Sequence, residues 1–409
     1  MKKILFLITT FLSFTSYAST SINAQDIMSK QKAILQNFGN AILHDKGTDS
    51  KKLTAISFAT QCKNNAPIYS YEGTYSFKDR RTINQNSLFQ VGSITKSFIS
   101  VIILQLAQEQ KFSLDDPDFM KKWFPEYPKW SKITLRQLMN MTSGIPNNND
   151  IKDDDIFRKF TANEYRSYIK PVTILNLEYQ LPLDFVPGTQ YEYSNTNYTL
   201  LGAFIERITH HSIQDEVQTR IIDKLNLHHT YFPKNKLAEL PEVNKAEIVH
   251  GYNFYRQGSE PYAFQKYGQD VTSFSLAYAN AAGAIASTPL DINTFIHALY
   301  HPGKLLNTAQ IKELTTLIST ENGQAFSPEK QPGVIGYGLG IFGFYLKEEN
   351  NLIFWYQGET NGFQFSYFYV PVTQLYLIFG INSTAPILDR KPVLKFLDEV
   401  NELCEQTSL

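Results

Sequence analysis

The sequence predicts an α/β fold of the α+β type, in which helices flank one antiparallel sheet. Runs rich in β-branched and aromatic residues gather near both ends of the 409-residue chain, whereas helical spacing dominates the middle. Hydrophobic residues make up 43% of the chain and charged residues 19%, which suits a large packed core. The simplest architecture joins both ends in one sheet and inserts a mainly helical lobe between them.

The first predicted elements are one helix and two strands. Residues 25–45 place apolar side chains at helical spacing. Strand-like runs follow at 53–60 and 68–77, and the polar residues 64–67 form the turn between them. This order predicts a hairpin that forms one part of the sheet.

The middle of the chain is predicted to be helical. Residues 97–108 are almost continuously apolar, which indicates a buried helix, and residues 133–142 and 197–209 predict two more. The stretches 146–190 and 232–275 are polar, aromatic and irregular. We therefore expect a lobe of helices joined by long irregular segments.

Strand signals return late in the chain. The runs 352–356, 363–370 and 374–381 alternate or are continuously apolar, and residues 392–404 predict a closing helix. We expect a single domain over residues 19–409. Its sheet lobe would take up about 25–115 and 280–409, and its helical lobe about 116–279.

The N-terminus has the pattern of a secretory signal peptide. Lys2 and Lys3 precede an apolar run at 4–16, and small residues at Ser16 and Ala18 predict cleavage after Ala18. The mature protein would then be exported, periplasmic or secreted, with no stable membrane anchor. The alternative is a buried N-terminal helix.

Charge and cysteine content narrow the function classes. The formal net charge of −1 argues against a nucleic-acid binder, which normally presents a basic face. No metal-ligand cluster is apparent, and we expect no cofactor. The two cysteines, Cys62 and Cys404, either pair in an oxidising compartment or stay apart as buried thiols. The expected partner is a small-molecule or peptide substrate.

A serine three residues before a lysine is the central motif, and the chain contains it at Ser29, Ser93, Ser167 and Ser327. Ser93 alone follows a strand-like run and opens the most apolar predicted helix. At such a helix start, Lys96 shares a face with Ser93, and burial would favour its neutral, basic form. The helix N-terminus also offers main-chain N–H groups to an oxyanion. Context therefore selects Ser93 as nucleophile and Lys96 as its activator.

Several ordered segments carry a family resemblance. They are residues 86–98 around Ser93, 112–117, 133–138, 142–146, the pair Pro187-Gly188, the triplet Tyr193-Ser194-Asn195, Leu200-Leu201-Gly202, and the small-residue stretch 281–288. In this order they resemble the serine β-lactamase and penicillin-recognising family, in its class C β-lactamase and D-alanyl-D-alanine carboxypeptidase branch. The resemblance covers about residues 52–400 and implies a β-lactamase/transpeptidase-like fold.

The resemblance implies roles for the second motif. Tyr193 would hold or pass a proton beside Lys96, and the Asn195 amide would contact both the lysine and the substrate. A second Tyr-x-Asn pattern at Tyr278 lacks the preceding Pro-Gly and the following Leu-Leu-Gly, so we prefer Tyr193. The alternative is a loop tyrosine with a turn-forming asparagine.

The third motif departs from the family. Members usually carry Lys-Thr-Gly or His-x-Gly on the strand that lines the site, whereas the matching residues here are Tyr356, Gln357 and Gly358. A tyrosine supplies no positive charge for a substrate carboxylate at neutral pH. By resemblance, Gly358 allows close backbone approach and the Glu359 N–H is the second oxyanion donor. His301-Pro302-Gly303 fits the motif literally, but we interpret it as a turn.

These residues predict an enzyme that forms an acyl-enzyme at Ser93. One reading is a β-lactamase-related or D-alanyl-D-alanine carboxypeptidase-like hydrolase acting on cell-wall-derived substrates. A second is an esterase or amidase for neutral acyl substrates, which suits the lost cation. A third is a non-hydrolytic binding protein of the same fold, which the intact catalytic motifs disfavour.

Overall fold

The computed structural model describes residues 24–44, 52–110, 112–147, 170–234, 236–254, 267–276, 279–346, 350–385 and 390–406. The predicted signal peptide at 1–18, Ser167 and Tyr278 lie outside these residues. Within them, no helix is both long enough and apolar enough to cross a membrane.

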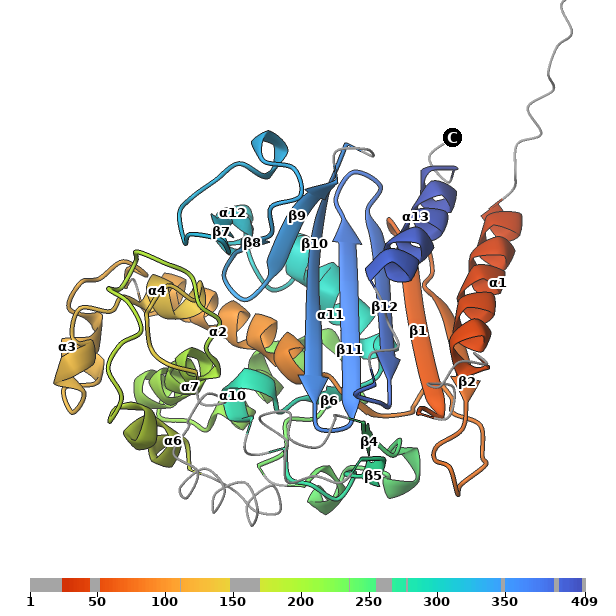
Figure 1. Ribbon diagram of the computed structural model, residues 1–409, viewed down its shortest axis with the longest axis horizontal. Coiled ribbons are helices and arrows are strands. Elements are labelled where there is room, and N and C mark those ends of the chain that lie inside the picture. The colour runs from red at the N-terminus through yellow and green to blue at the C-terminus, as the bar shows by residue number, and fades with distance from the viewer. Residues whose placement is uncertain are drawn as a thin grey trace, which may run out of the picture.

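One eight-stranded antiparallel sheet forms the centre of the molecule, in the order β2-β1-β12-β11-β10-β9-β8-β7 (Figure 1). The strands are β1 Ala55–Cys62, β2 Ile68–Gly73, β7 Ile318–Ser319, β8 Gly336–Tyr337, β9 Phe342–Leu346, β10 Asn351–Thr360, β11 Phe363–Val370 and β12 Leu375–Ile381. Strand β1 pairs with β12, so both ends of the chain share the sheet and this prediction is confirmed. The short strands β7 to β9 were not predicted, because two to five residues give little periodicity.

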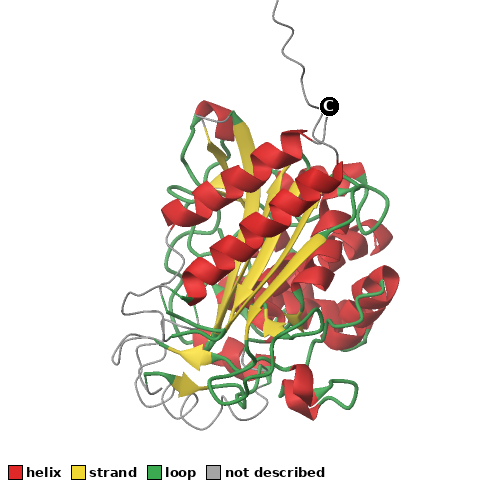
Figure 2. Cartoon of the chain, turned by 90° about the vertical axis from the view of Figure 1, so that its right-hand side faces the viewer, coloured by secondary structure: helices red, strands yellow, loops and turns green. Residues whose placement is uncertain are grey.

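The two terminal helices cover one face of the sheet (Figure 2). They are α1 Ala24–Leu43 and α13 Arg390–Gln406. The Phe38 ring of α1 stacks on Phe396 of α13 with centroids 4.0 Å apart, and both rings contact Phe58 of β1. This apolar layer matches the predicted first and last helices, whose apolar faces need the sheet for burial.

A disulfide joins Cys62 of β1 to Cys404 of α13, with a Cα–Cα distance of 5.5 Å. The bond lies in the layer between the sheet and the terminal helices. Of the two alternatives that the sequence left open for these cysteines, the structure has the pair.

The other helices of the described residues lie on the opposite face of the sheet and beyond its β7 edge (Figure 1). They are α2 Thr95–Gln110, α3 Phe119–Trp123, α4 Leu135–Met139, α6 Pro171–Glu178, α7 Asn195–Thr209, α8 Ile213–Val217, α9 Asp223–Leu225, α10 Asn280–Gly283, α11 Pro289–Tyr300 and α12 Thr308–Thr315. Helix α2 is buried on every side over most of its length, as its apolar sequence predicts. Its Phe98 ring stacks on Phe295 of α11 with centroids 3.6 Å apart.

Helix α6 corrects the prediction that residues 146–190 are irregular. Pro171 begins the helix, where its missing N–H costs nothing, and Ile174 and Leu175 are buried. The β-branched residues at its start weaken the helical signal in the sequence. Packing against the rest of the protein, rather than local sequence, therefore makes this segment helical.

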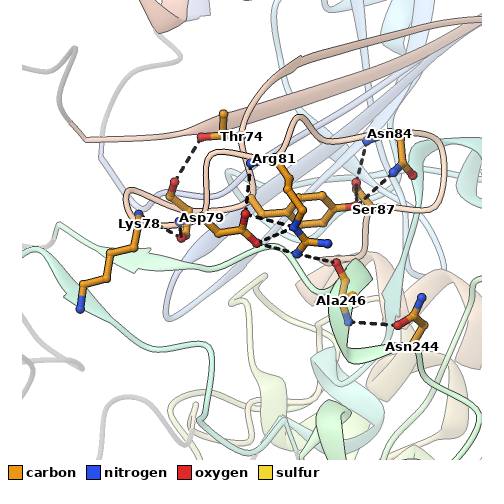
Figure 3. Close-up of polar contacts among 10 residues, drawn as sticks. Thr74, Lys78, Asp79, Arg81, Asn84, Ser87, Asn244 and Ala246 are labelled. Atoms are coloured by element: carbon orange, nitrogen blue, oxygen red, sulfur yellow. Dashed lines mark hydrogen bonds and ion pairs between the residues drawn. The ribbon is translucent and has the colours of Figure 1, made fainter.

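The segment before Ser93 is tied down by polar contacts (Figure 3). Arg81 pairs with Asp79 and also donates to the Ala246 carbonyl, in the short 3₁₀ turn Lys245–Glu247. The Ser87 hydroxyl donates to the Tyr75 hydroxyl at 2.9 Å. These contacts hold the chain entering β3 (Phe89–Gln90), which pairs with β6 (Ala286–Ser287). A second two-stranded ribbon is formed by β4 (Tyr252–Asn253) and β5 (Gln269–Asp270).

Candidate active site

Ser93 lies in a tight turn between strand β3 and helix α2. The turn is a 3₁₀ segment, Gly92–Ile94, and α2 begins directly after it. Gly92 has φ +52°, and a Cβ there would lie 2.6 Å from the Glu359 main-chain nitrogen. Only glycine fits this backbone and this close approach. The turn therefore brings Ser93 against strand β10.

Lys96 is fully buried one helical turn after Ser93. Its Nζ lies 3.0 Å from Ser93 Oγ, and it donates to Asn195 Oδ1 at 2.8 Å and to the Ala282 carbonyl at 2.7 Å. None of these three partners is charged. Because burial penalises the ammonium and no carboxylate compensates, the pKa of Lys96 falls well below its usual value.

Tyr193 approaches the nucleophile from the segment before helix α7. Its hydroxyl donates to Ser93 Oγ at 2.8 Å, and Lys96 Nζ lies 4.9 Å from its ring centroid. Burial raises the pKa of Tyr193 to about 12, and its hydrogen bonds to Ser93 and Tyr356 oppose that rise. Tyr193 is therefore a neutral phenol in the resting site.

Asn195 begins helix α7, and its main-chain N–H donates to Asn147 Oδ1 at 3.0 Å. This contact ties the start of α7 to the segment at 142–147. The Asn195 amide oxygen then faces Lys96, as described above. The second motif is thus hydrogen-bonded to Lys96 through Asn195 and to Ser93 through Tyr193.

Tyr356, on β10, points into the site, at the position where the family pattern has a cation. It is 1% exposed, and its hydroxyl lies 3.2 Å from the Tyr193 hydroxyl and 2.8 Å from the Tyr337 hydroxyl. Burial raises its pKa well above the usual tyrosine value, so it stays neutral. This side of the site therefore offers phenol hydroxyls in place of a charge.

Gly358 allows β10 to pack against the nucleophile turn. A Cβ at this position would lie 1.9 Å from the Val91 carbonyl oxygen and 2.8 Å from the Ser93 main-chain nitrogen. The next residue, Glu359, has its main-chain nitrogen beside Gly92, as noted above. Although solvent reaches the Glu359 side chain, the surrounding protein desolvates its carboxyl and raises its pKa to about 7.

All seven residues singled out in the sequence lie together. The competing Ser-x-x-Lys copies lie elsewhere: the Ser29 hydroxyl is exposed on α1 and donates to the Gln25 carbonyl, and Ser327 precedes a short 3₁₀ turn. His301 ends helix α11, so the prediction that its Pro-Gly sequence is a turn is confirmed. The structure thus separates the Ser93 copy from the other described copies.

Sequence reasoning missed three groups of this site. They are the Tyr337 hydroxyl, the Ala282 carbonyl and the Asn147 side chain. The only signal for Tyr337 is its place between two glycines, Gly336 and Gly338, where an added Cβ would collide with neighbouring atoms. Among the described residues, no group of three or more His, Cys, Asp or Glu side chains could hold a metal ion.

Comparisons with known proteins agree with this geometry. The family model described as Beta-lactamase matches residues 57–402, most of the chain. Protein flp of Staphylococcus aureus (strain MRSA252) is 28% identical over 276 residues, which are 64% of this chain and 50% of that protein. A penicillin-binding protein of Bacillus subtilis (strain 168) is 26% identical over 67% of this chain and 56% of its own length. The chain thus spans about half the length of these curated relatives.

Solved structures with the same fold cover nearly the whole chain. A D-stereospecific amidohydrolase from Streptomyces sp. shares 26% identity at a TM-score of 0.71, over 89% of this chain and 97% of that one. The D-amino acid amidase of Ochrobactrum anthropi SV3, complexed with L-phenylalanine amide, has a TM-score of 0.74 at 22% identity, over 94% and 100%. With the family match over most of its length, this chain belongs to the beta-lactamase family of serine hydrolases.

Proposed function

We propose that this protein is an amidohydrolase or esterase that forms an acyl-enzyme at Ser93 and takes substrates without a free carboxylate next to the reacting carbonyl. The observation that carries the proposal is Tyr356, a buried neutral phenol at the position where the family pattern has a cation. Its hydroxyl is engaged by Tyr193 and Tyr337 and brings no charge to a ligand. A carboxylate desolvated here would lack the charged partner that such burial requires.

Lys96 is the proposed base. A neutral amine has two N–H donors and one lone pair. Asn195 Oδ1 and the Ala282 carbonyl can only accept hydrogen bonds, so they take up both donors. The lone pair is then left for Ser93, whose Oγ lies 3.0 Å away. This arrangement activates the serine hydroxyl without a carboxylate or a metal ion.

The proposed reaction moves one proton through the site. Ser93 Oγ attacks the carbonyl carbon and its proton passes to Lys96 Nζ, while the N–H groups of Ser93 and Glu359 stabilise the oxyanion. When the carbonyl–leaving group bond breaks, Tyr193, which lies 2.8 Å from Ser93 Oγ, protonates the departing nitrogen or oxygen. The Lys96 ammonium restores the Tyr193 proton. Water then hydrolyses the acyl-enzyme by the reverse sequence of proton transfers.

D-amino acid amides are the first substrate class to test. Support comes from the D-stereospecific amidohydrolase of Streptomyces sp., which is 26% identical over nearly the whole chain. An amide of this kind ends in a neutral CO–NH₂ group, which suits a site without a cation. The proposed partner is therefore a small molecule.

A second candidate is a carboxypeptidase or β-lactamase that acts on cell-wall-derived peptides or β-lactams. The similarity to the penicillin-binding protein of Bacillus subtilis favours it. Such substrates carry a free carboxylate, so this candidate requires a cation from outside the Tyr356 position. The substrate comparison below separates the two candidates.

We also propose that the protein is exported, to the periplasm or the medium. Lys2, Lys3 and the apolar run at 4–16 support a cleaved signal peptide. The Cys62–Cys404 disulfide supports an oxidising compartment, because such bonds are rare in the cytosol. N-terminal sequencing of the protein from culture fractions tests this directly, with Ser19 expected as the first residue.

The decisive experiment compares substrates on one enzyme preparation. Purified mature protein is given D- and L-phenylalanine amide, a peptide ending in D-alanyl-D-alanine, and a fluorescent penicillin. Ser93→Ala removes the proposed nucleophile, and Ser29→Ala is the matched control in a competing Ser-x-x-Lys copy. We expect turnover of D-phenylalanine amide that Ser93→Ala abolishes and Ser29→Ala leaves intact. Preferred turnover of the D-alanyl peptide or the penicillin would overturn the substrate proposal.

A further inference from the structure

We propose that Tyr337 and Tyr356 are positioning residues that extend the catalytic site into a chain of phenol hydroxyls ending at Ser93. The chain holds the Tyr193 hydroxyl in place and stabilises the negative charge that forms on it when it protonates the leaving group. This inference rests on the proposed acyl transfer at Ser93. It assigns roles to Tyr337, which no sequence motif marks, and to Tyr356 beyond substrate selection.

The hydroxyl groups form a continuous chain, in which Tyr193 is partly exposed whereas Tyr337 and Tyr356 are shielded from water. From Tyr337 to Tyr356 the hydroxyl oxygens are 2.8 Å apart, from Tyr356 to Tyr193 3.2 Å, and from Tyr193 to Ser93 Oγ 2.8 Å. Tyr337 and Tyr356 are at most 1% exposed. A hydrogen bond shielded from water in this way is stronger than one at the surface.

Counting the hydroxyl protons shows that the hydrogen bonds of the tyrosine chain all run in one direction. Each tyrosine hydroxyl donates one hydrogen bond, and Tyr193 uses its proton on Ser93. The Tyr193 oxygen can then only accept, so the 3.2 Å contact makes Tyr356 the donor. Tyr356 has thereby used its proton, and Tyr337 must donate to it at 2.8 Å. Every hydroxyl therefore points toward Ser93.

This direction matters at the moment the leaving group departs. The Tyr193 O–H bond breaks as its proton moves to the departing nitrogen, and a phenolate forms on Tyr193. The Tyr356 O–H already points at that oxygen, so it stabilises the new charge without reorganisation. The proton returns from the Lys96 ammonium, since Lys96 Nζ and the Tyr193 hydroxyl lie on the same oxygen, Ser93 Oγ, at 3.0 and 2.8 Å. Two neutral phenols thus support the Tyr193 phenolate without a charged partner.

Packing fixes the far end of the chain. The Tyr337 ring contacts Tyr193 edge-on at 6.4 Å and Phe342 edge-on at 4.6 Å. An added Cβ at the next residue, Gly338, would lie 2.3 Å from the Leu314 carbonyl oxygen. The close backbone contact and the flanking rings hold the Tyr337 ring, and with it the hydroxyl oxygen, beside Tyr356.

The test removes single hydroxyls and varies the need for leaving-group protonation. Tyr356→Phe and Tyr337→Phe are assayed on two substrates with the same acyl group, an unactivated amide and a p-nitrophenyl ester. Nitrophenolate departs without a proton, whereas the amide nitrogen needs one. The matched control is Tyr300→Phe, because Tyr300 also bonds a buried tyrosine hydroxyl, Tyr367, at 3.2 Å, but does not contact Tyr193.

We expect kcat/KM on the amide to fall roughly 10- to 100-fold in Tyr356→Phe, which loses a bond to a forming charge, and roughly 3- to 10-fold in Tyr337→Phe. The ester rate should change less than about threefold, and the Tyr300→Phe control should change neither rate by more than that. Equal losses of kcat/KM on both substrates, or unchanged amide turnover in both variants, would overturn the proposal of a tyrosine chain. If Tyr356→Phe does not fold, Tyr337→Phe carries the test.

Failure of the chain and failure of the proposed substrate class are distinguishable. The two substrates carry whichever acyl group the wild type turns over best, so a preference for L-amino acyl or uncharged acyl groups leaves the test intact. Wild-type turnover with the wrong acyl preference counts against the proposed substrate. If the variants lose the same factor in kcat/KM on the amide and on the ester, the result counts against the tyrosine chain alone.

Discussion

Replacing Lys96 by methionine should change how the stability of the protein depends on pH. The Lys96 side chain is fully buried and its pKa is lowered well below the usual value by desolvation. In the unfolded chain the same lysine titrates near pH ~10.4. Between the two pKa values the unfolded state therefore holds one proton that the native state lacks.

The sign follows from this difference in bound protons. Unfolding within that window takes up one proton, and a higher pH makes this uptake less favourable, so the native state gains stability as the pH rises. While the native lysine is neutral and the unfolded one is charged, the free energy of unfolding rises with the limiting slope for one group, ~1.4 kcal/mol per pH unit. Lys96→Met lacks this contribution, so its free energy of unfolding should rise less with pH than that of the wild type. Lys96→Met also leaves Asn195 Oδ1 and the Ala282 carbonyl without their hydrogen-bond donor, which changes stability at every pH. The comparison therefore uses the slope of the free energy of unfolding against pH, not its absolute value.

The assay is equilibrium urea unfolding at several pH values between 7 and 9, with the disulfide kept oxidised. Lys312→Met is the control, since Lys312 is exposed on α12 and meets water in both states. We expect the wild-type free energy of unfolding to rise with pH more steeply than that of Lys96→Met, by up to ~1.4 kcal/mol per pH unit. Parallel curves would refute the reasoning, because Lys96 would then carry the same charge in the native and unfolded states, and a native ammonium is no base.

Three further predictions concern the site and its support. Tyr356→Lys should raise the second-order rate constant for acylation by benzylpenicillin roughly 10-fold or more, because a cation then binds the penicillin carboxylate. Gly358→Ala should slow fluorophosphonate labelling by roughly 100-fold, since its Cβ would lie 1.9 Å from a main-chain oxygen and displace the nucleophile turn. Replacing Cys62 and Cys404 by serine should cost roughly 3–5 kcal/mol in urea unfolding, because their bond closes a separation of 342 residues.

Each of these predictions has its own control. Tyr356→Phe tests whether charge, rather than loss of the phenol, changes penicillin acylation, and equal rates in the lysine and phenylalanine variants would contradict the account. Gly333→Ala is the control without a collision: alanine is strained at the Gly333 φ of +84°, but no atom lies within 4 Å of the added Cβ, so the labelling rate should not change. The cysteine variant should keep the wild-type labelling rate, because the disulfide lies on the sheet face opposite Lys96. Stability unchanged by that variant would argue against the pairing.

The sequence predicted those parts of the fold whose signals are local. Helix α2 is apolar all round because it is buried all round, and β11 shows its strand character over its full length. The strands β7 and β8 have two residues each, too few for any period. Helix α6 was missed for another reason, since its start is β-branched and its buried face packs on α7, far along the chain.

The candidate site also has contacts that the sequence predicts and contacts that it does not. Ser93 and Lys96 are one helical turn apart, so their meeting follows from helix geometry. The sequence also indicated that Tyr356 stands where a cation is expected. It could not indicate that the Tyr356 hydroxyl bonds Tyr337, because that contact joins two strands with β9 between them in the sheet. The Ala282 contact uses a main-chain carbonyl, which any residue would supply.

Covalent trapping tests the central claim most directly. The mature protein is incubated with a fluorophosphonate, digested and analysed by mass spectrometry, alongside Ser93→Ala and Ser29→Ala. The account predicts one adduct per chain, on the peptide that contains Ser93, present in Ser29→Ala and absent in Ser93→Ala. An adduct on another residue, or equal labelling of Ser93→Ala, would contradict Ser93 as the nucleophile.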